Sequence, residues 1–173
     1  MTATSPNKVK WLNKTIVETA KRHGLNPVVV MSMCAKESSF DTHAMRFEPG
    51  WKWFLNPAKW AKIVSTTKRT EEIGQMISWG LMQVMGTVAR EHGFAQDFPR
   101  LSRVDQGLLY GCLHLKKLLL KYPLPEALAA YNAGIGNRNS KVGKAYADHV
   151  LSLMEGYRVL LVEEGLIYNG INS

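Results

Sequence analysis

The sequence is poor in the residues that cross-link a small secreted fold or hold a structural metal. Only two of its 173 residues are cysteines, Cys34 and Cys112, and they show no zinc-type spacing. Each lies in an apolar, helix-like segment, so we expect both to be small buried hydrophobes. The histidines show no metal-ligand spacing either. We therefore expect neither a metal nor a cofactor.

Long apolar runs are also missing. The N-terminal stretch "MTATSPNKVKWLNK" lacks the apolar core of roughly 7 to 15 residues that secretory signals contain. No run approaches the ~18 apolar residues that predict a membrane helix. The expectation is a chain synthesised in the cytoplasm without a signal peptide, and with no membrane partner.

Acidic residues are outnumbered by basic ones, 14 to 22, which gives a formal net charge of +8. A positive charge favours anionic partners such as nucleic acid, membrane surfaces or bacterial wall polymers, and does not choose among them. The basic residues are scattered along the chain, so a solvated basic surface is the simplest interpretation. A basic helical nucleic-acid-binding domain stays as an alternative, although no recognition helix is evident.

The sequence has no alternating strand pattern, internal repeat or Pro/Gly/Ser linker, whereas helix signals recur. Asn26–Pro27 and Asn56–Pro57 are typical of helix starts, and "SRVDQGLLYGCLHLKKLLLKYP" places its apolar residues on one side of a central helix. Further helices are expected from Pro6, near Thr70, from Pro125 to Gly134, and from Gly143 to Gly165. The fold class is all-α, in a single domain over residues 1–173.

One carboxyl closes an uncharged segment. Glu37, in "AKESSF", follows "NPVVVMSMC" at the expected end of a helix. An apolar environment disfavours ionisation, so we expect the pKa of Glu37 to be raised. A glutamate at a helix end is ordinarily a surface charge, and this residue alone does not identify a catalytic acid.

Three further segments follow "ESSF" in a fixed order, namely "WGLMQVM" at 79–85, "AAYNAG" at 129–134 and "YADHV" at 146–150. Together the four resemble the soluble lytic transglycosylase domain, a goose-type-lysozyme-like helical fold that cuts bacterial peptidoglycan. The resemblance covers about residues 27–157. It implies that the glycan strands of peptidoglycan are the substrate.

The resemblance also implies roles for single residues. Glu37 corresponds to the catalytic glutamate, and residues 80–83 correspond to the family's Gly-Leu-Met-Gln turn, whose glutamine faces the bound sugars. The implied substrate-binding residues are Ser38, Gln83, Met85, Tyr131, Asn132 and Tyr146, the last as the tyrosine that orients the glutamate. From the residues alone, Gln83 and Asn132 could be caps or turn formers, and the two tyrosines half-buried core residues.

A second catalytic carboxylate is not evident. Hydrolytic glycosidases pair two carboxyls, and Asp41 and Glu48 are the nearest to Glu37 in sequence, but neither matches a family catalytic position. The resemblance implies that Glu37 first protonates the leaving oxygen of the MurNAc-GlcNAc β-1,4 bond. It then takes a proton from the muramic acid 6-hydroxyl, and a 1,6-anhydro end forms without water, as in a carbon–oxygen lyase. A hydrolytic lysozyme on the same fold and a catalytically silent phage tail protein stay as alternatives.

The interval between Glu37 and Gly80 is far longer than is usual in the family. This insertion, about residues 41–78, is rich in aromatic residues and holds "RFEPGWKWFLNPAKW". Trp51, Trp53 and Trp60 could stack on sugar rings or could anchor the insertion to the domain. Both interpretations stay open at this point.

The expected substrate lies outside the cytoplasmic membrane, so the chain needs a delivery route. A phage origin would supply one, as an endolysin released through a holin or as a tail-borne or virion-borne enzyme. Phage tail or virion components would then be further partners. A specialised secretion system is the other option.

Overall fold

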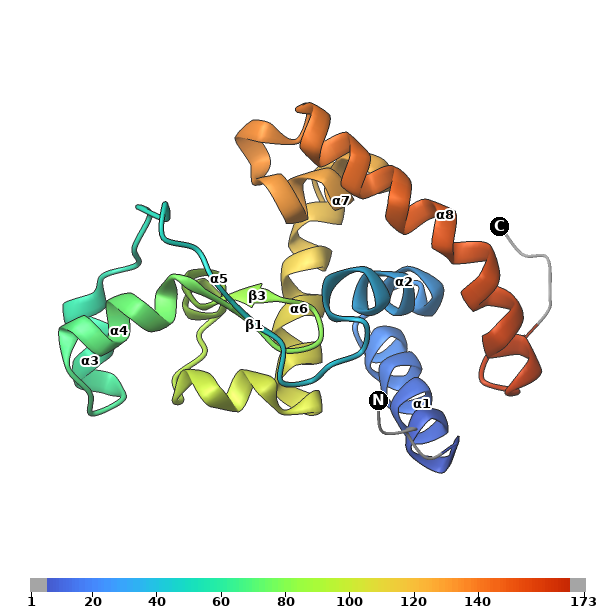
Figure 1. Ribbon diagram of the computed structural model, residues 1–173, viewed down its shortest axis with the longest axis horizontal. Coiled ribbons are helices and arrows are strands. Elements are labelled where there is room, and N and C mark those ends of the chain that lie inside the picture. Colours follow the sequence, from blue (N-terminus) through green and yellow to red (C-terminus); the bar gives the residue numbers. More distant parts are fainter. Residues whose placement is uncertain (1–5, 169–173) are drawn as a thin grey trace. The chain divides into compact units, whose positions relative to one another are not determined.

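Proline starts several of the helices, as the sequence predicts. In the computed structural model, which describes residues 6–168 (Figure 1), α1 (Pro6–Arg22), α2 (Pro27–Ser38) and α3 (Pro57–Ile63) each begin at a proline. The side chain of Asn56 caps α3 by accepting from the backbone N–H of Lys59. A proline is favoured at this position because its missing N–H has no partner inside the helix.

Five more helices follow, and those that the sequence predicted differ from the expected ranges at their ends. They are α4 (Lys68–Gln75), α5 (Gly86–Glu91), α6 (Val104–Leu119), α7 (Leu124–Ala133) and α8 (Lys141–Glu163), with short 3-10 turns η1 (Phe98–Ser102) and η2 (Ile135–Asn137). Thr67, not Thr70, caps α4 through its side chain, and Ser140 does the same for α8. The all-α prediction is confirmed, and α5 is a helix that the sequence did not indicate.

A small antiparallel sheet was not predicted. Strands β1 (Met45–Phe47), β2 (Ile77–Trp79) and β3 (Val84–Met85) lie in the order β1-β2-β3, with Met45 opposite Trp79 and Trp79 opposite Val84. Strands of two or three residues are too short to show an alternating pattern, which explains why the sequence did not reveal them.

The elements fall into two compact units. Unit 1 comprises the chain up to Lys36 and from Leu115 onward, and unit 2 comprises Glu37–His114. In unit 1, α7 packs along α8 (Figure 1), and Leu118, Ala127 and Ala130 form a buried cluster. The boundaries between the units fall in the last turn of α2 and within α6.

Both cysteines are buried, as predicted, and neither forms a disulfide. Burial raises the pKa of the Cys112 thiol to about 12, so this thiol is protonated at neutral pH. Among residues 6–168, no helix is long and apolar enough to cross a membrane.

A buried ion pair organises unit 2. The Arg90 guanidinium donates to both carboxylate oxygens of Glu71, at 2.8 and 2.9 Å, and the two side chains are 0% and 1% exposed. The guanidinium also lies 4.0 Å from the ring centre of Phe98 and 5.0 Å from that of Trp60. Trp60 therefore has an anchoring contact, because its ring lies over a buried charge.

Gln75 links the ion pair to the irregular segment around Leu55. The Gln75 amide donates to Glu71 at 3.0 Å and to the carbonyl of Leu55 at 3.1 Å, and its oxygen accepts from the backbone N–H of Leu55 at 2.8 Å. Such a network is stabilising only when all its members are satisfied. One buried amide thus holds both backbone groups of a residue in an irregular segment.

Candidate active site

Glu37 lies in the last turn of α2. Every residue from Val28 to Cys34 is buried, whereas Glu37 and Ser38 are half-buried. The helix ends because Ser39 and Phe40 both adopt left-handed conformations, with φ of 50° and 63°. Two successive non-glycine residues in this region are uncommon and are typical of constrained functional segments. Glu37 thus lies at the end of α2, where the buried residues of the helix are followed by partly exposed ones.

Ser38 ties the end of α2 to the turn between β2 and β3. Its Oγ donates a hydrogen bond of 2.9 Å to the carbonyl oxygen of Leu81. Leu81 belongs to the "GLMQ" segment, so two of the four sequence motifs are joined directly, in one unit. The serine beside the glutamate therefore has a structural contact in addition to any contact with substrate.

Gln83 forms the turn itself. Its side-chain N–H groups donate to the carbonyl oxygens of Ala44 and Gly80, both at 2.9 Å, while its backbone N–H donates to Gly80 at 3.0 Å. Because both of these carbonyl groups can only accept hydrogen bonds, the nitrogen end of the Gln83 amide must point toward them. The Oε1 atom accepts no hydrogen bond from any of residues 6–168. Gln83 is therefore a turn former, and its amide oxygen receives no hydrogen bond within the described part of the chain.

Gly80 allows this turn to form, since its φ is +69° and a Cβ there would overlap the carbonyl oxygen of Leu101. We expect Gly80→Ala to destabilise the protein by about 2 to 5 kcal/mol, from backbone strain and overpacking together. The matched control is Gly93→Ala, where φ is +83° but nothing lies within 4 Å. That change should cost about 1 to 2 kcal/mol. Urea unfolding measures both, and equal losses would show that Leu101 yields freely.

Met85 lies in β3 next to Ser78, whose Oγ lies 3.2 Å from the Met85 sulfur. In the sheet, Met85 pairs with Ser78, and Ser78 with Arg46, so the three side chains share one face. Met85 is half-buried. It is therefore accessible to a ligand at this face of the sheet.

The other three predicted residues belong to unit 1. Tyr131 is half-buried on α7 and packs against the cluster of Leu118, Ala127 and Ala130. Asn132, the next residue, is exposed, and Tyr146 is buried on α8. The structure therefore groups Glu37, Ser38, Gln83 and Met85 in unit 2, and Tyr131, Asn132 and Tyr146 in unit 1.

The two carboxylates nearest to Glu37 in sequence have local partners. Asp41 is exposed and accepts from the backbone N–H of His43 at 2.9 Å, which is a turn-forming contact. Glu48 accepts from the Arg46 guanidinium at 2.5 Å. Among residues 6–168, no three His, Cys, Asp or Glu side chains come together as a metal site.

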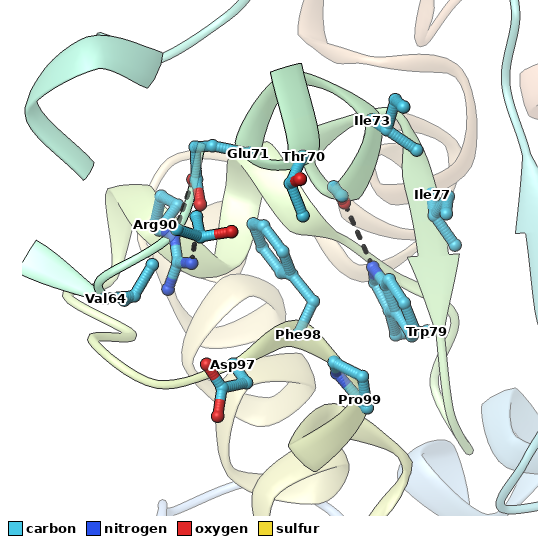
Figure 2. A pocket seen from close by; sticks show the side chains of 12 residues that line it. Val64, Thr70, Glu71, Ile73, Ile77, Trp79, Arg90, Asp97, Phe98 and Pro99 are labelled. Carbon is cyan, nitrogen blue, oxygen red and sulfur yellow. Dashed lines mark hydrogen bonds and ion pairs between the residues drawn. The ribbon is translucent and has the colours of Figure 1, made fainter. Parts of the chain in front are cut away.

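A separate cavity of about 210 Å³ lies elsewhere in unit 2 (Figure 2). Figure 2 shows Phe98 between the Glu71–Arg90 pair and Trp79, and the rings of Phe98 and Trp79 are stacked 5.9 Å apart. The cavity is lined mainly by apolar atoms. The charges of Glu71 and Arg90 in its wall neutralise each other. None of the predicted substrate-binding residues lines it, so it is not the candidate active site.

Comparison with known proteins agrees with the motif pattern. The family model described as "Transglycosylase SLT domain" matches residues 14–150. This range includes Glu37, the turn at Gly80–Gln83, Tyr131, Asn132 and Tyr146. No curated protein matches the chain.

Proposed function

Because the chain belongs to the transglycosylase SLT domain family, we propose that it cleaves the MurNAc-GlcNAc β-1,4 bond of peptidoglycan with Glu37 as its acid and base. A lytic transglycosylase function and a peptidoglycan substrate follow from the family. The proposal adds the bond, the residues and the product. One observation carries it: Glu37 lies beside Ser38, which is hydrogen-bonded to the turn that Gln83 forms.

In the first step, Glu37 donates its proton to the O4 atom of the leaving GlcNAc as the bond from that oxygen to C1 of MurNAc breaks. A carboxyl can do this near neutral pH when its surroundings favour the protonated form. The residues of α2 that precede Glu37, from Val28 to Cys34, are buried and mostly apolar. General acid catalysis of this kind contributes roughly 10²- to 10⁴-fold to the rate.

In the second step, the ionised Glu37 removes the proton from the 6-hydroxyl of the same MurNAc, and O6 bonds to C1. One C–O bond has broken, another has formed, and the proton is returned to Glu37. Water is not consumed. A single carboxyl therefore completes the cycle, in agreement with the local engagement of Asp41 and Glu48.

The other residues of the site would bind sugar. The free Oε1 atom of Gln83 suits an N–H of an acetamido group or a sugar hydroxyl, because its position is already fixed by two hydrogen bonds. Met85 and Ser38 are half-buried and accessible in the same unit. We assign Tyr131, Asn132 and Tyr146 to substrate binding by their motif match, with Tyr146 orienting the glutamate.

The reaction is tested by digesting purified peptidoglycan sacculi and weighing the soluble products by mass spectrometry. We expect muropeptides that end in 1,6-anhydro-MurNAc, because the 6-hydroxyl rather than water attacks C1. Products one water heavier, with reducing ends, would instead support a hydrolytic lysozyme on this fold that uses Asp41 or Glu48. Digestion in H₂¹⁸O separates the two, since only hydrolysis incorporates the label.

A further inference from the structure

Trp53 is the most exposed of the five tryptophans, at 70%, and it lies in an irregular segment of the insertion. Single exposed apolar residues are common on protein surfaces and by themselves carry no meaning. The segment from Glu48 to Asn56 is unusual because it is irregular and yet held at several points. Its contacts decide what the exposed indole can do.

The segment is fixed at both ends by hydrogen bonds to buried or paired groups. At its start, the backbone N–H of Glu48 donates to the carbonyl of Met76 at 2.8 Å and so extends the pairing of β1 with β2. At its end, the buried Gln75 amide holds both backbone groups of Leu55. Both ends of the segment that carries Trp53 are therefore held by hydrogen bonds.

Trp51 supports Trp53 from within the segment. Its indole N–H is shared between the carbonyl oxygen of Trp53, at 2.9 Å, and the Oγ1 atom of Thr87, at 3.0 Å. Thr87 is buried and donates in turn to Gln75. The two indole rings meet edge to face, with centres 5.1 Å apart and planes 69° apart. Trp51 therefore anchors the segment, whereas Trp53 is presented to solvent.

We propose that Trp53 is a stacking platform for a pyranose ring of the glycan strand, and thus a sugar-binding site in the insertion. The apolar C–H face of a pyranose matches the flat face of an indole. A ring held in place before binding loses little conformational entropy when the sugar stacks on it. Lys52, the preceding residue, is exposed and adds a positive charge to the same segment.

The proposal rests on the peptidoglycan substrate of the proposed function. It does not rest on the catalytic role of Glu37, so binding is measured in the Glu37→Gln background, where turnover does not interfere. Cosedimentation with purified sacculi gives the dissociation constant. We expect Trp53→Ala to weaken binding about fivefold to tenfold and Trp53→Phe to retain most of it, because phenylalanine keeps an aromatic face.

Trp11 provides the matched control. It is also exposed, at 55%, but lies on α1 in unit 1, and Trp11→Ala should bind sacculi like the parent. Trp51→Phe keeps a ring but removes the N–H that holds Trp53, so it should show an intermediate loss. Thermal unfolding should leave Trp53→Ala within about 2 °C of the parent, since an exposed side chain contributes little to stability.

The outcomes separate this inference from the proposed function. If the parent binds sacculi and Trp53→Ala binds equally well, or if Trp11→Ala loses as much, the sugar platform is wrong while the catalytic proposal stands. If the parent itself does not bind sacculi, the sugar platform is wrong, and the product analysis of the active enzyme decides the proposed function separately. A selective loss in Trp53→Ala, together with anhydro products from the active enzyme, supports both.

Discussion

Replacing Glu37 with glutamine should lower the release of soluble muropeptides at least about a thousandfold. Glutamine has nearly the same shape but can neither donate a carboxyl proton nor take one from the 6-hydroxyl. Both steps of the proposed cycle fail together, which places the loss at the upper end of the range for general acid–base catalysis. Turbidity loss of a sacculus suspension and product counts by mass spectrometry measure it.

Two control variants accompany this change. Asp41→Asn and Glu48→Gln alter the neighbouring carboxylates, whose partners are local, and should keep nearly the parental rate. If Glu37→Gln clears walls as well as the parent, Glu37 is not the acid. If the parent itself is inactive, the catalytically silent alternative is supported. A loss confined to Asp41→Asn or Glu48→Gln would favour the hydrolytic mechanism.

Replacing Arg90 with methionine should destabilise the protein by about 3 to 5 kcal/mol, because the Glu71 carboxylate is then buried without its partner. The pair is almost fully enclosed, and Arg90 also donates to the carbonyl oxygens of Phe94 and Gln96. For a chain of this length, we expect the Tm to fall by about 6 to 20 °C. Thermal and urea unfolding followed by circular dichroism measure the change.

Arg100→Met is the matched control. Its partner Asp97 lies 4.0 Å away, both side chains are more than half exposed, and such pairs contribute about 0 to 1 kcal/mol. The double variant Glu71→Met, Arg90→Met should recover much of the stability lost by Arg90→Met, since no charge is left buried. A double variant as unstable as the single one would show that packing around Phe98, and not the unpaired carboxylate, causes the loss.

Local sequence signals predicted the helices well. Pro6, Pro27 and Pro57 start helices because their fixed φ and missing N–H suit the first helical position. Gly134 ends α7, with a φ of +80° that glycine adopts without strain. The order of the motifs around Glu37, Gln83 and Tyr131 indicated the family, and the match over residues 14–150 confirms it.

The roles of the tryptophans in the insertion could not be predicted. Trp51 and Trp60 anchor it through Thr87 and Arg90, whereas Trp53 is exposed, and all three occur in one short sequence run. Glu71 lies in the first turn of α4 and is also fully buried. Its partner Arg90 is 19 positions away in the chain, and no local pattern connects them.

The same distinction applies to the candidate site. By itself, the sequence determined the helical class, the family and the identity of a lone carboxyl after an apolar run, because these depend on local residue patterns and on the order of short motifs along the chain. Only the tertiary structure decided that Gln83 holds the carbonyl of Ala44, 39 positions away, and thereby leaves its amide oxygen free. It likewise decided that Ser38 joins the end of α2 to that turn. The physical reason is that a hydrogen bond between distant residues requires the backbone of the whole unit to bring them together.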